Sequence, residues 1–130
     1  MNTHQSSRRF ATASVVAAAM LTGGCGSLGD TGSIRAASDL AIDCRTDEAL
    51  AALDKAEQSG GLSKYLAGLE RVGILRDAGR DDEAARALTA YKAQPEVASS
   101  DDAEIERSLD KFVADLRDER REKSGSATCQ

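Results

Sequence analysis

Residues 47–56 read Asp-Glu-Ala-Leu-Ala-Ala-Leu-Asp-Lys-Ala, and residues 82–91 read Asp-Glu-Ala-Ala-Arg-Ala-Leu-Thr-Ala-Tyr. Each stretch opens with two acids, which the helix dipole favours at a helix start, and then carries alanine and leucine at three- and four-residue spacing. Both stretches therefore predict amphipathic α-helices. Their constant offset of 35 residues indicates that they are equivalent parts of an internal repeat.

Turn-forming residues set the expected limits of these helices and define two more helices around them. Glycine ends helices, and proline disfavours helical geometry in the residue before it. The expected ends are Gly60-Gly61, Gly79 and Gln94-Pro95. Short polar side chains cap helix starts. The expected starts are Thr46, Ser63, Asp81 or Asp82, and Asp101.

The apolar positions of the two further helices also recur with helical spacing. The expected buried residues are Leu66, Leu69, Val72 and Gly73 in one, and Ile105, Leu109, Phe112, Val113 and Leu116 in the other. No stretch alternates with a period of two, so we expect an all-α fold: a small stack of antiparallel helical hairpins, with about four helices, over residues 39–123. Residues 39–44 fit either a turn of helix or an extended lead-in. Arg120 and Arg121 are interpreted as part of a solvated helix end.

The repeat resembles a known helical family. Gly79-Arg80-Asp81-Asp82-Glu83-Ala84, followed by Leu88, Tyr91 and Pro95, is similar to the turn and second helix of a tetratricopeptide repeat, whose period is 34 residues. The resemblance covers roughly residues 46–95 and implies closely packed hairpins that serve protein–protein interaction. Val72 and Leu75 stand where the family places glycine and tyrosine. The alternative is a plain antiparallel bundle of good helix formers.

The N-terminal segment has the features of a bacterial export signal. Arg8 and Arg9 precede the uncharged run 11–21, which is too short to span a bilayer permanently. The following Leu21-Thr22-Gly23-Gly24-Cys25 resembles the lipobox of bacterial lipoproteins. That resemblance implies a signal peptide at residues 1–24, removed before Cys25, and a lipid, such as palmitate, on the Cys25 residue. The alternative is an ordinary secreted protein with a cysteine after its signal.

The residues after Cys25 bear on location. Residues 25–38 are rich in glycine and serine and are predicted to be a flexible linker behind the lipidated cysteine. No aspartate directly follows Cys25, which in envelopes of the enterobacterial kind implies passage to the outer membrane. The expected location is therefore the cell envelope, with the protein anchored by lipid to the outer membrane and facing the periplasm.

Two further cysteines remain once Cys25 is lipidated. An even pair in an exported protein predicts a disulfide, here between Cys44 and Cys129. It would close a long loop and fasten the tail, residues 124–130, to the start of the domain. The alternative is two independent thiols, one of them pairing with another protein.

Composition excludes several classes of function. Without the two arginines of the signal, 15 basic groups face 22 acidic groups, a formal charge of −7, which argues against nucleic acid as a partner. The single histidine, His4, lies in the signal, so the mature chain has no imidazole for general-base catalysis or for a metal site. We expect no enzymatic activity, no catalytic residues, no metal and no cofactor.

The remaining class is an interaction module. We expect a helical protein–protein interaction or scaffold module that holds an envelope protein partner. Its possible contact residues are Lys64, Tyr65, Arg71 and Tyr91. Tyrosine at helical spacing also fits a core position with its hydroxyl at the edge. The alternative function is an autonomous structural or stress-related envelope lipoprotein without a dedicated binding groove.

Overall fold

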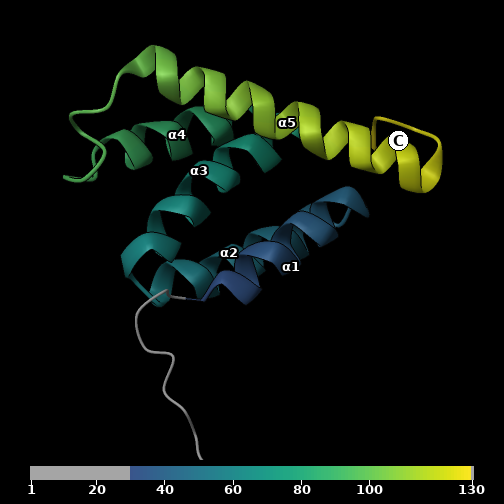
Figure 1. The fold of residues 1–130 in the computed structure, drawn as a ribbon, viewed down its shortest axis with the longest axis horizontal. Coiled ribbons are helices and arrows are strands. Elements are labelled where there is room, and N and C mark those ends of the chain that lie inside the picture. The colour runs from purple at the N-terminus through teal and green to yellow at the C-terminus, as the bar shows by residue number, and fades with distance from the viewer. Residues whose placement is uncertain (1–29, 130) are drawn as a thin grey trace, which may run out of the picture.

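The computed structural model describes residues 30–129, and all regular structure in that range is helical (Figure 1). The helices are α1 (Thr31–Ile42), α2 (Thr46–Gln58), α3 (Gly61–Asp77), α4 (Asp81–Lys92) and α5 (Asp102–Ser124). α1 and α2 form one antiparallel hairpin, α3 and α4 form a second, and α5 lies across both. The prediction of an all-α fold is confirmed, with five helices in place of about four.

The two helices of each hairpin are connected by the same type of turn. Cys44 and Gly79, 35 residues apart, both adopt the left-handed backbone conformation, with φ of 61° and 70°. The residues that follow them, Arg45 and Arg80, each donate a backbone N–H over 2.9 Å to a carbonyl in the last turn of the preceding helix. The repeat found in the sequence is therefore also present in the structure, where it includes the first helix of each hairpin.

Side chains repeat in these turns as well. Arg45 Nε donates to Glu48 Oε1 over 2.8 Å, and Arg80 Nε donates to Glu83 Oε1 over the same distance. Arg80 Nη1 also reaches Asp47 in the first turn, at 2.7 Å. One arginine of the second copy thus bridges the two equivalent turns.

The boundary predicted for the linker is wrong from residue 31 onward. Asp30 accepts a hydrogen bond from the Ser33 N–H over 3.0 Å and caps α1, which extends through Ile42. Ile34, Ala37 and Ala41 are buried with spacings of three and four, as a core-facing helix requires. Residues 39–42 are therefore helical. Cys25, its neighbours to residue 29 and the predicted signal peptide lie outside the described residues.

Two predicted helix starts also need correction. Gly60 and Gly61 both have positive φ, 72° and 58°, so the chain reverses within two residues and α3 begins at Gly61. Ser63 consequently lies inside α3 and is fully buried. Thr46 is the first residue of α2, not its cap. Asp101 caps α5 as predicted, accepting from the Ala103 N–H over 2.9 Å.

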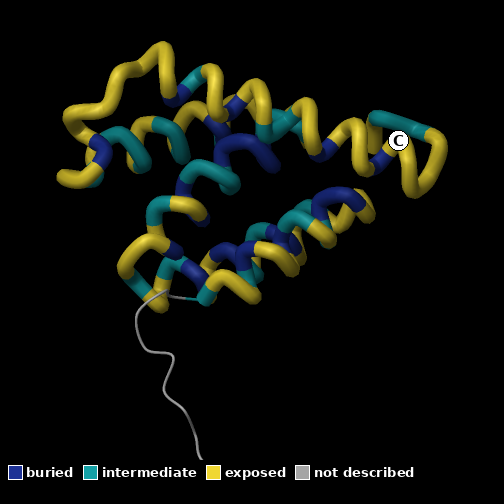
Figure 2. The backbone as a smooth tube through the Cα atoms, viewed as in Figure 1, coloured by how far each residue is buried: buried dark blue, intermediate teal, exposed yellow. Residues whose placement is uncertain are grey.

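The core has two parts, separated by α3 (Figure 2). The first lies among α1, α2, α3 and α5, and its members are Ile34, Ala37, Ala41, Ile42, Ala49, Leu53, Ala56, Ala67, Ile74 and Leu116. The second lies among α3, α5 and the segment after α4, and contains Val72, Val97, Ile105 and Leu109. Half of the members of the first part are alanines, which lets its helices approach closely. Leu66 of the predicted stripe is exposed, whereas Leu75 is buried.

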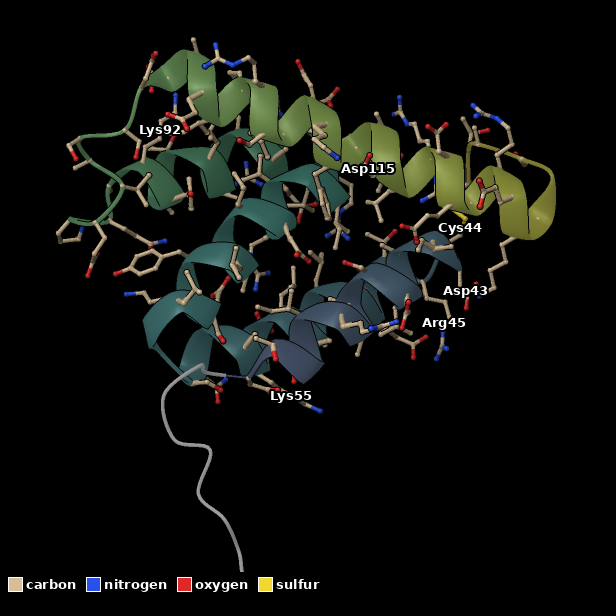
Figure 3. The ribbon with its side chains drawn as sticks, in the orientation of Figure 1. Asp43, Cys44, Arg45, Lys55, Lys92 and Asp115 are labelled. Atoms are coloured by element: carbon tan, nitrogen blue, oxygen red, sulfur yellow. A yellow bond between two sulfur atoms is a disulfide. The ribbon has the colours of Figure 1, made fainter. Side chains whose placement is uncertain are left out.

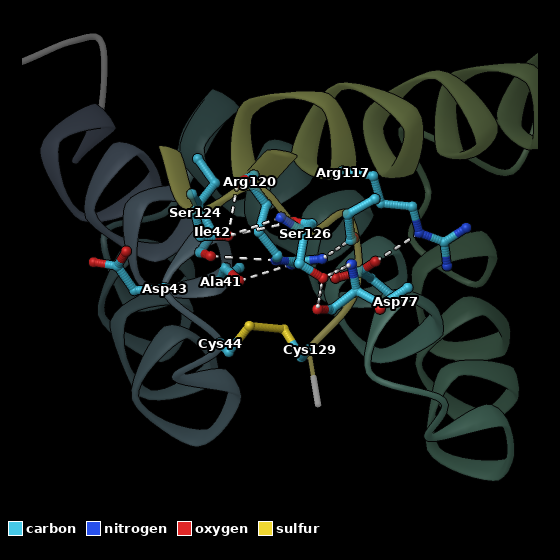
Figure 4. Close-up of a disulfide and its surroundings, with 12 residues drawn as sticks. Ala41, Ile42, Asp43, Cys44, Asp77, Arg117, Arg120, Ser124, Ser126 and Cys129 are labelled. Atoms are coloured by element: carbon cyan, nitrogen blue, oxygen red, sulfur yellow. Dashed lines mark hydrogen bonds and ion pairs between the residues drawn. A yellow bond between two sulfur atoms is a disulfide. The ribbon is translucent and has the colours of Figure 1, made fainter. Parts of the chain in front are cut away.

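Arg120 is buried near the end of α5, which corrects the prediction that it is solvated (Figure 4). Its guanidinium donates to the carbonyls of Ala41 and Ile42, at 2.8 and 3.2 Å, and to that of Ala127, at 2.8 Å. The first two are carbonyls at the C-terminal end of α1, which lack partners within their own helix. Arg120 thus caps α1 from another part of the chain, while its neighbour Arg121 is exposed as predicted.

The disulfide lies beside this arginine. Cys44 and Cys129 are bonded, with their Cα atoms 5.4 Å apart and a sequence separation of 85 (Figure 4). The bond joins the α1–α2 turn to the segment after α5. The predicted pairing is therefore present, and it fastens the tail as expected.

Candidate partner-binding pocket

Three of the four predicted contact residues line one pocket. Lys64 and Arg71 come from α3 and Tyr91 from α4, and the pocket between α2, α3 and α4 has a volume of about 200 Å³. Its complete lining is Glu57, Lys64, Gly68, Arg71, Ala87, Ala90, Tyr91 and Gln94. A space of this size admits one side chain of another molecule.

Gly68 sets how closely α4 approaches α3 at the pocket. A Cβ added there would lie 3.0 Å from Tyr91 Cδ2 and 3.3 Å from Gln94 Nε2. The missing side chain therefore allows the Tyr91 ring and the Gln94 amide to pack directly on the α3 backbone.

Arg71 is held in place by acids of α2. It donates to Glu57 Oε1 over 2.9 Å and to Asp54 Oδ1 over 2.6 Å, and its side chain is 22% exposed. Desolvation opposes its charge, but the hydrogen bonds to Glu57 and Asp54 outweigh that effect and raise the pKa of Arg71. The guanidinium is thus a fixed, charged wall of the pocket.

Gln94 lines the pocket and carries an acceptor without a hydrogen-bond partner. Among the buried side-chain nitrogen and oxygen atoms of the described residues, its Oε1 is the one that lacks a hydrogen-bond partner. A buried acceptor without a partner costs about 1–3 kcal/mol. A bound group that donates a hydrogen bond to this oxygen would recover that energy. Sequence patterns give no signal for this residue, because it follows α4 in an irregular segment.

The two tyrosines are placed differently. Tyr91 lines the pocket, and burial raises the pKa of its hydroxyl. Tyr65 does not line the pocket. Its hydroxyl shares a hydrogen bond with Glu96, which is the main cause of the raised pKa of Tyr65 and of the lowered pKa of Glu96. Both rings also pack against the second part of the core.

Other hollows offer less defined chemistry. One of them, about 610 Å³, lies between the C-terminal ends of α1 and α5 and is lined by Asp39, Ile42, Glu119, Glu122 and Lys123. No group of three or more metal-ligating side chains occurs among residues 30–129. Within the same range, no helix has the length and apolar character needed to cross a bilayer.

Comparison with known proteins found no match to this chain among protein-family models, curated proteins or solved structures.

Proposed function

We propose that this chain is a lipid-anchored protein of the cell envelope that acts as a protein–protein interaction module in the periplasm. The observation that carries the interaction role is a pocket of side-chain size lined by Gln94, whose buried Oε1 lacks a hydrogen-bond partner. The lipobox-like segment ending at Cys25 supports the anchor and the location. The repeated hairpins and the resemblance to tetratricopeptide repeats support a scaffold role.

The lining of the pocket defines the chemistry of its ligand. Gly68, Ala87, Ala90 and the Tyr91 ring provide apolar walls, and Gln94 provides an acceptor. Arg71 is already paired with acids, so it does not demand an anion from the partner. The best fit is a partner side chain with an apolar stem and an N–H or O–H donor at its tip, presented by a loop or peptide.

The test is a cross-linked pull-down of tagged full-length protein from solubilised envelopes. Ala90→Trp fills the pocket from its rim, and Ala51→Trp places the same bulk on an exposed face of α2 that does not line the pocket. We expect one partner that is recovered with the wild type and with Ala51→Trp and is lost with Ala90→Trp. Equal recovery with both variants, or no partner from folded protein, would favour the autonomous envelope lipoprotein.

The anchor is tested separately. Cys25→Ala should move the protein out of the membrane fraction and weaken partner recovery, because the acyl chains would supply the attachment. Retention of Cys25→Ala in the membrane fraction at high salt would show that lipid on Cys25 is not the anchor.

A further inference from the structure

Two leucines on α3 are exposed to solvent. Leu62 and Leu66 are 55% and 38% exposed. Within residues 30–129, no other large apolar side chain is classed as exposed. They are one turn apart and therefore share a face of the helix. At 100° per residue, that face is roughly opposite the one that carries Lys64 and Arg71 into the pocket. The leucines are thus not part of the pocket already described.

These leucines lie at the end of the molecule where the chain leads toward Cys25. α1 is antiparallel to α2, so Asp30 at the start of α1 lies beside the end of α2, close enough for Lys55 to lower its pKa in addition to the larger effect of Ser33. α3 begins three residues after α2 ends. Figure 1 shows the start of α1 close to the α2–α3 junction, and Figure 3 shows Lys55 near this end of the hairpin and Arg45 at the other end.

The stretch between Cys25 and the start of α1 is short. Cys25 and Thr31 are six residues apart, and a fully extended chain spans at most about 20 Å over that distance. If Cys25 carries lipid in the bilayer surface, the start of α1 cannot lie further than this from the membrane. Near this end the exposed cations Arg35 and Lys55 accompany the acids Asp30, Asp54 and Glu57, the last two of which are already paired with Arg71. The acid-rich starts of α2 and α4 lie at the opposite end of the hairpins.

We propose that this end of the domain docks on the bilayer to which Cys25 is tethered, with Leu62 and Leu66 inserted among the lipid headgroups. The inference rests on the proposed lipid anchor and adds a second, weaker contact to it, because apolar side chains gain free energy on entering the interface. Arg35 and Lys55 then lie near the lipid phosphates. Docking through this face leaves the pocket on the other side of α3 directed away from the membrane and open to a partner.

The test is photo-crosslinking of the full chain, purified from envelopes and reconstituted into vesicles of phosphatidylethanolamine and phosphatidylglycerol. A benzophenone amino acid is placed at position 62 or, as the matched control, at exposed position 114 on α5. We expect at least five times more lipid adduct from position 62. Equal yields, no lipid adduct, or a protein adduct at position 62 would overturn the proposal.

Intact mass of the same samples reports whether Cys25 carries lipid, so failure of the anchor is seen independently. Lipid adducts at position 62 without lipid on Cys25 would overturn the anchor and support the docking face. Absence of both would overturn both. The variant Leu62→Ser/Leu66→Ser should lower lipid adducts from a probe at neighbouring position 58, whereas Leu50→Ser should not.

Discussion

Arg120 and Asp77 form a buried ion pair that joins the end of α5 to the end of α3, with 2.5 Å between Nη2 and Oδ2. Both side chains are at least 95% buried, and the same guanidinium also reaches the end of α1 and the tail. The charge of Asp77 is further neutralised by Arg117, at 2.9 Å. Three helices and the tail therefore meet at one arginine.

Replacing Arg120 should destabilise the fold severely. Arg120→Met leaves the Asp77 carboxylate buried with one partner and removes a donor from two α1 carbonyls, of which that of Ala41 keeps the Cys44 N–H. We therefore expect a loss of about 3 kcal/mol in the free energy of unfolding. Urea unfolding of oxidised protein measures this. Arg121→Met is the matched control, because Arg121 is exposed and pairs only with Asp118, and it should change stability by less than about 0.5 kcal/mol. Similar values for the two variants would contradict the role assigned to Arg120.

The disulfide should supply a large part of the stability. Its two cysteines are 85 residues apart, and the entropy of closing a loop of that length corresponds to about 4 kcal/mol. Cys129→Ser should therefore lower the urea midpoint strongly, and wild-type protein in reducing agent should behave in the same way. Cys25→Ser is the control that keeps the disulfide. An unchanged midpoint for Cys129→Ser would mean that Arg120 alone fastens the tail.

The internal repeat also predicts how the backbone conformation at Cys44 affects stability. Cys44 has a φ of 61°, and Gly79 occupies the equivalent place in the second turn. A side chain in this conformation costs about 1 kcal/mol relative to glycine. Cys44→Gly should thus be more stable than Cys44→Ser by about that amount, although both lose the disulfide. Equal unfolding midpoints for the two variants would contradict strain at this turn.

The sequence was sufficient to predict the helices that carry strong periodic patterns. The starts of α4 and α5 and the offset of the repeat all followed from the three- and four-residue spacing of apolar residues and from the acids and capping residues at helix starts. α1 was missed because Gly32, Ser33 and Ser38 gave residues 25–38 the composition of a linker. Its buried positions, Ile34, Ala37 and Ala41, carry the pattern but are too few and too small to outweigh that composition.

Long-range polar contacts could not be predicted in the same way. Arg120 stands in a run of charged residues, and what buries it is a set of carbonyls 78 and 79 residues away. No local pattern indicates such partners. Lys64, Arg71 and Tyr91, named from the sequence as possible contact residues, line one pocket, but Gln94 and Gly68 acquire their places in it only from the packing of α4 on α3.

Close packing of α5 on α3 depends on Gly73. A Cβ added at Gly73 would overlap the Phe112 ring, with Cε1 only 2.8 Å away. Gly73→Ala should therefore destabilise the fold by about 1–3 kcal/mol, even though alanine favours helix more than glycine does. The double variant Gly73→Ala/Phe112→Leu should lose less stability than the sum of the losses in the two single variants. Gly32→Ala, where the nearest atom is a flexible side chain at 3.4 Å, is the control and should be neutral or stabilising.

Glu70 should make stability depend on pH near neutrality. Burial on α3 raises the pKa of Glu70 from 4.5 to about 7, against the opposing effect of the hydrogen bond from Ser38 Oγ, 3.1 Å long. Between these two pH values the folded chain keeps a proton on Glu70 that the unfolded chain has lost. The contribution of Glu70 to the free energy of unfolding is therefore greatest at low pH and declines as the pH rises from about 4.5 to about 7.

Glu70→Gln removes this titration. The neutral amide avoids the desolvation of a carboxylate, so the variant should exceed the wild type in stability at pH 8, by about 1 kcal/mol after allowance for partial exposure of the site. At pH 4.5 the advantage should disappear, because Glu70 of the wild type is then protonated in the folded state. Urea midpoints at several pH values measure the difference, with Glu119→Gln, at an exposed position of α5, as the control. A constant difference between wild type and Glu70→Gln across this range would show that Glu70 ionises as freely in the folded protein as in the unfolded chain.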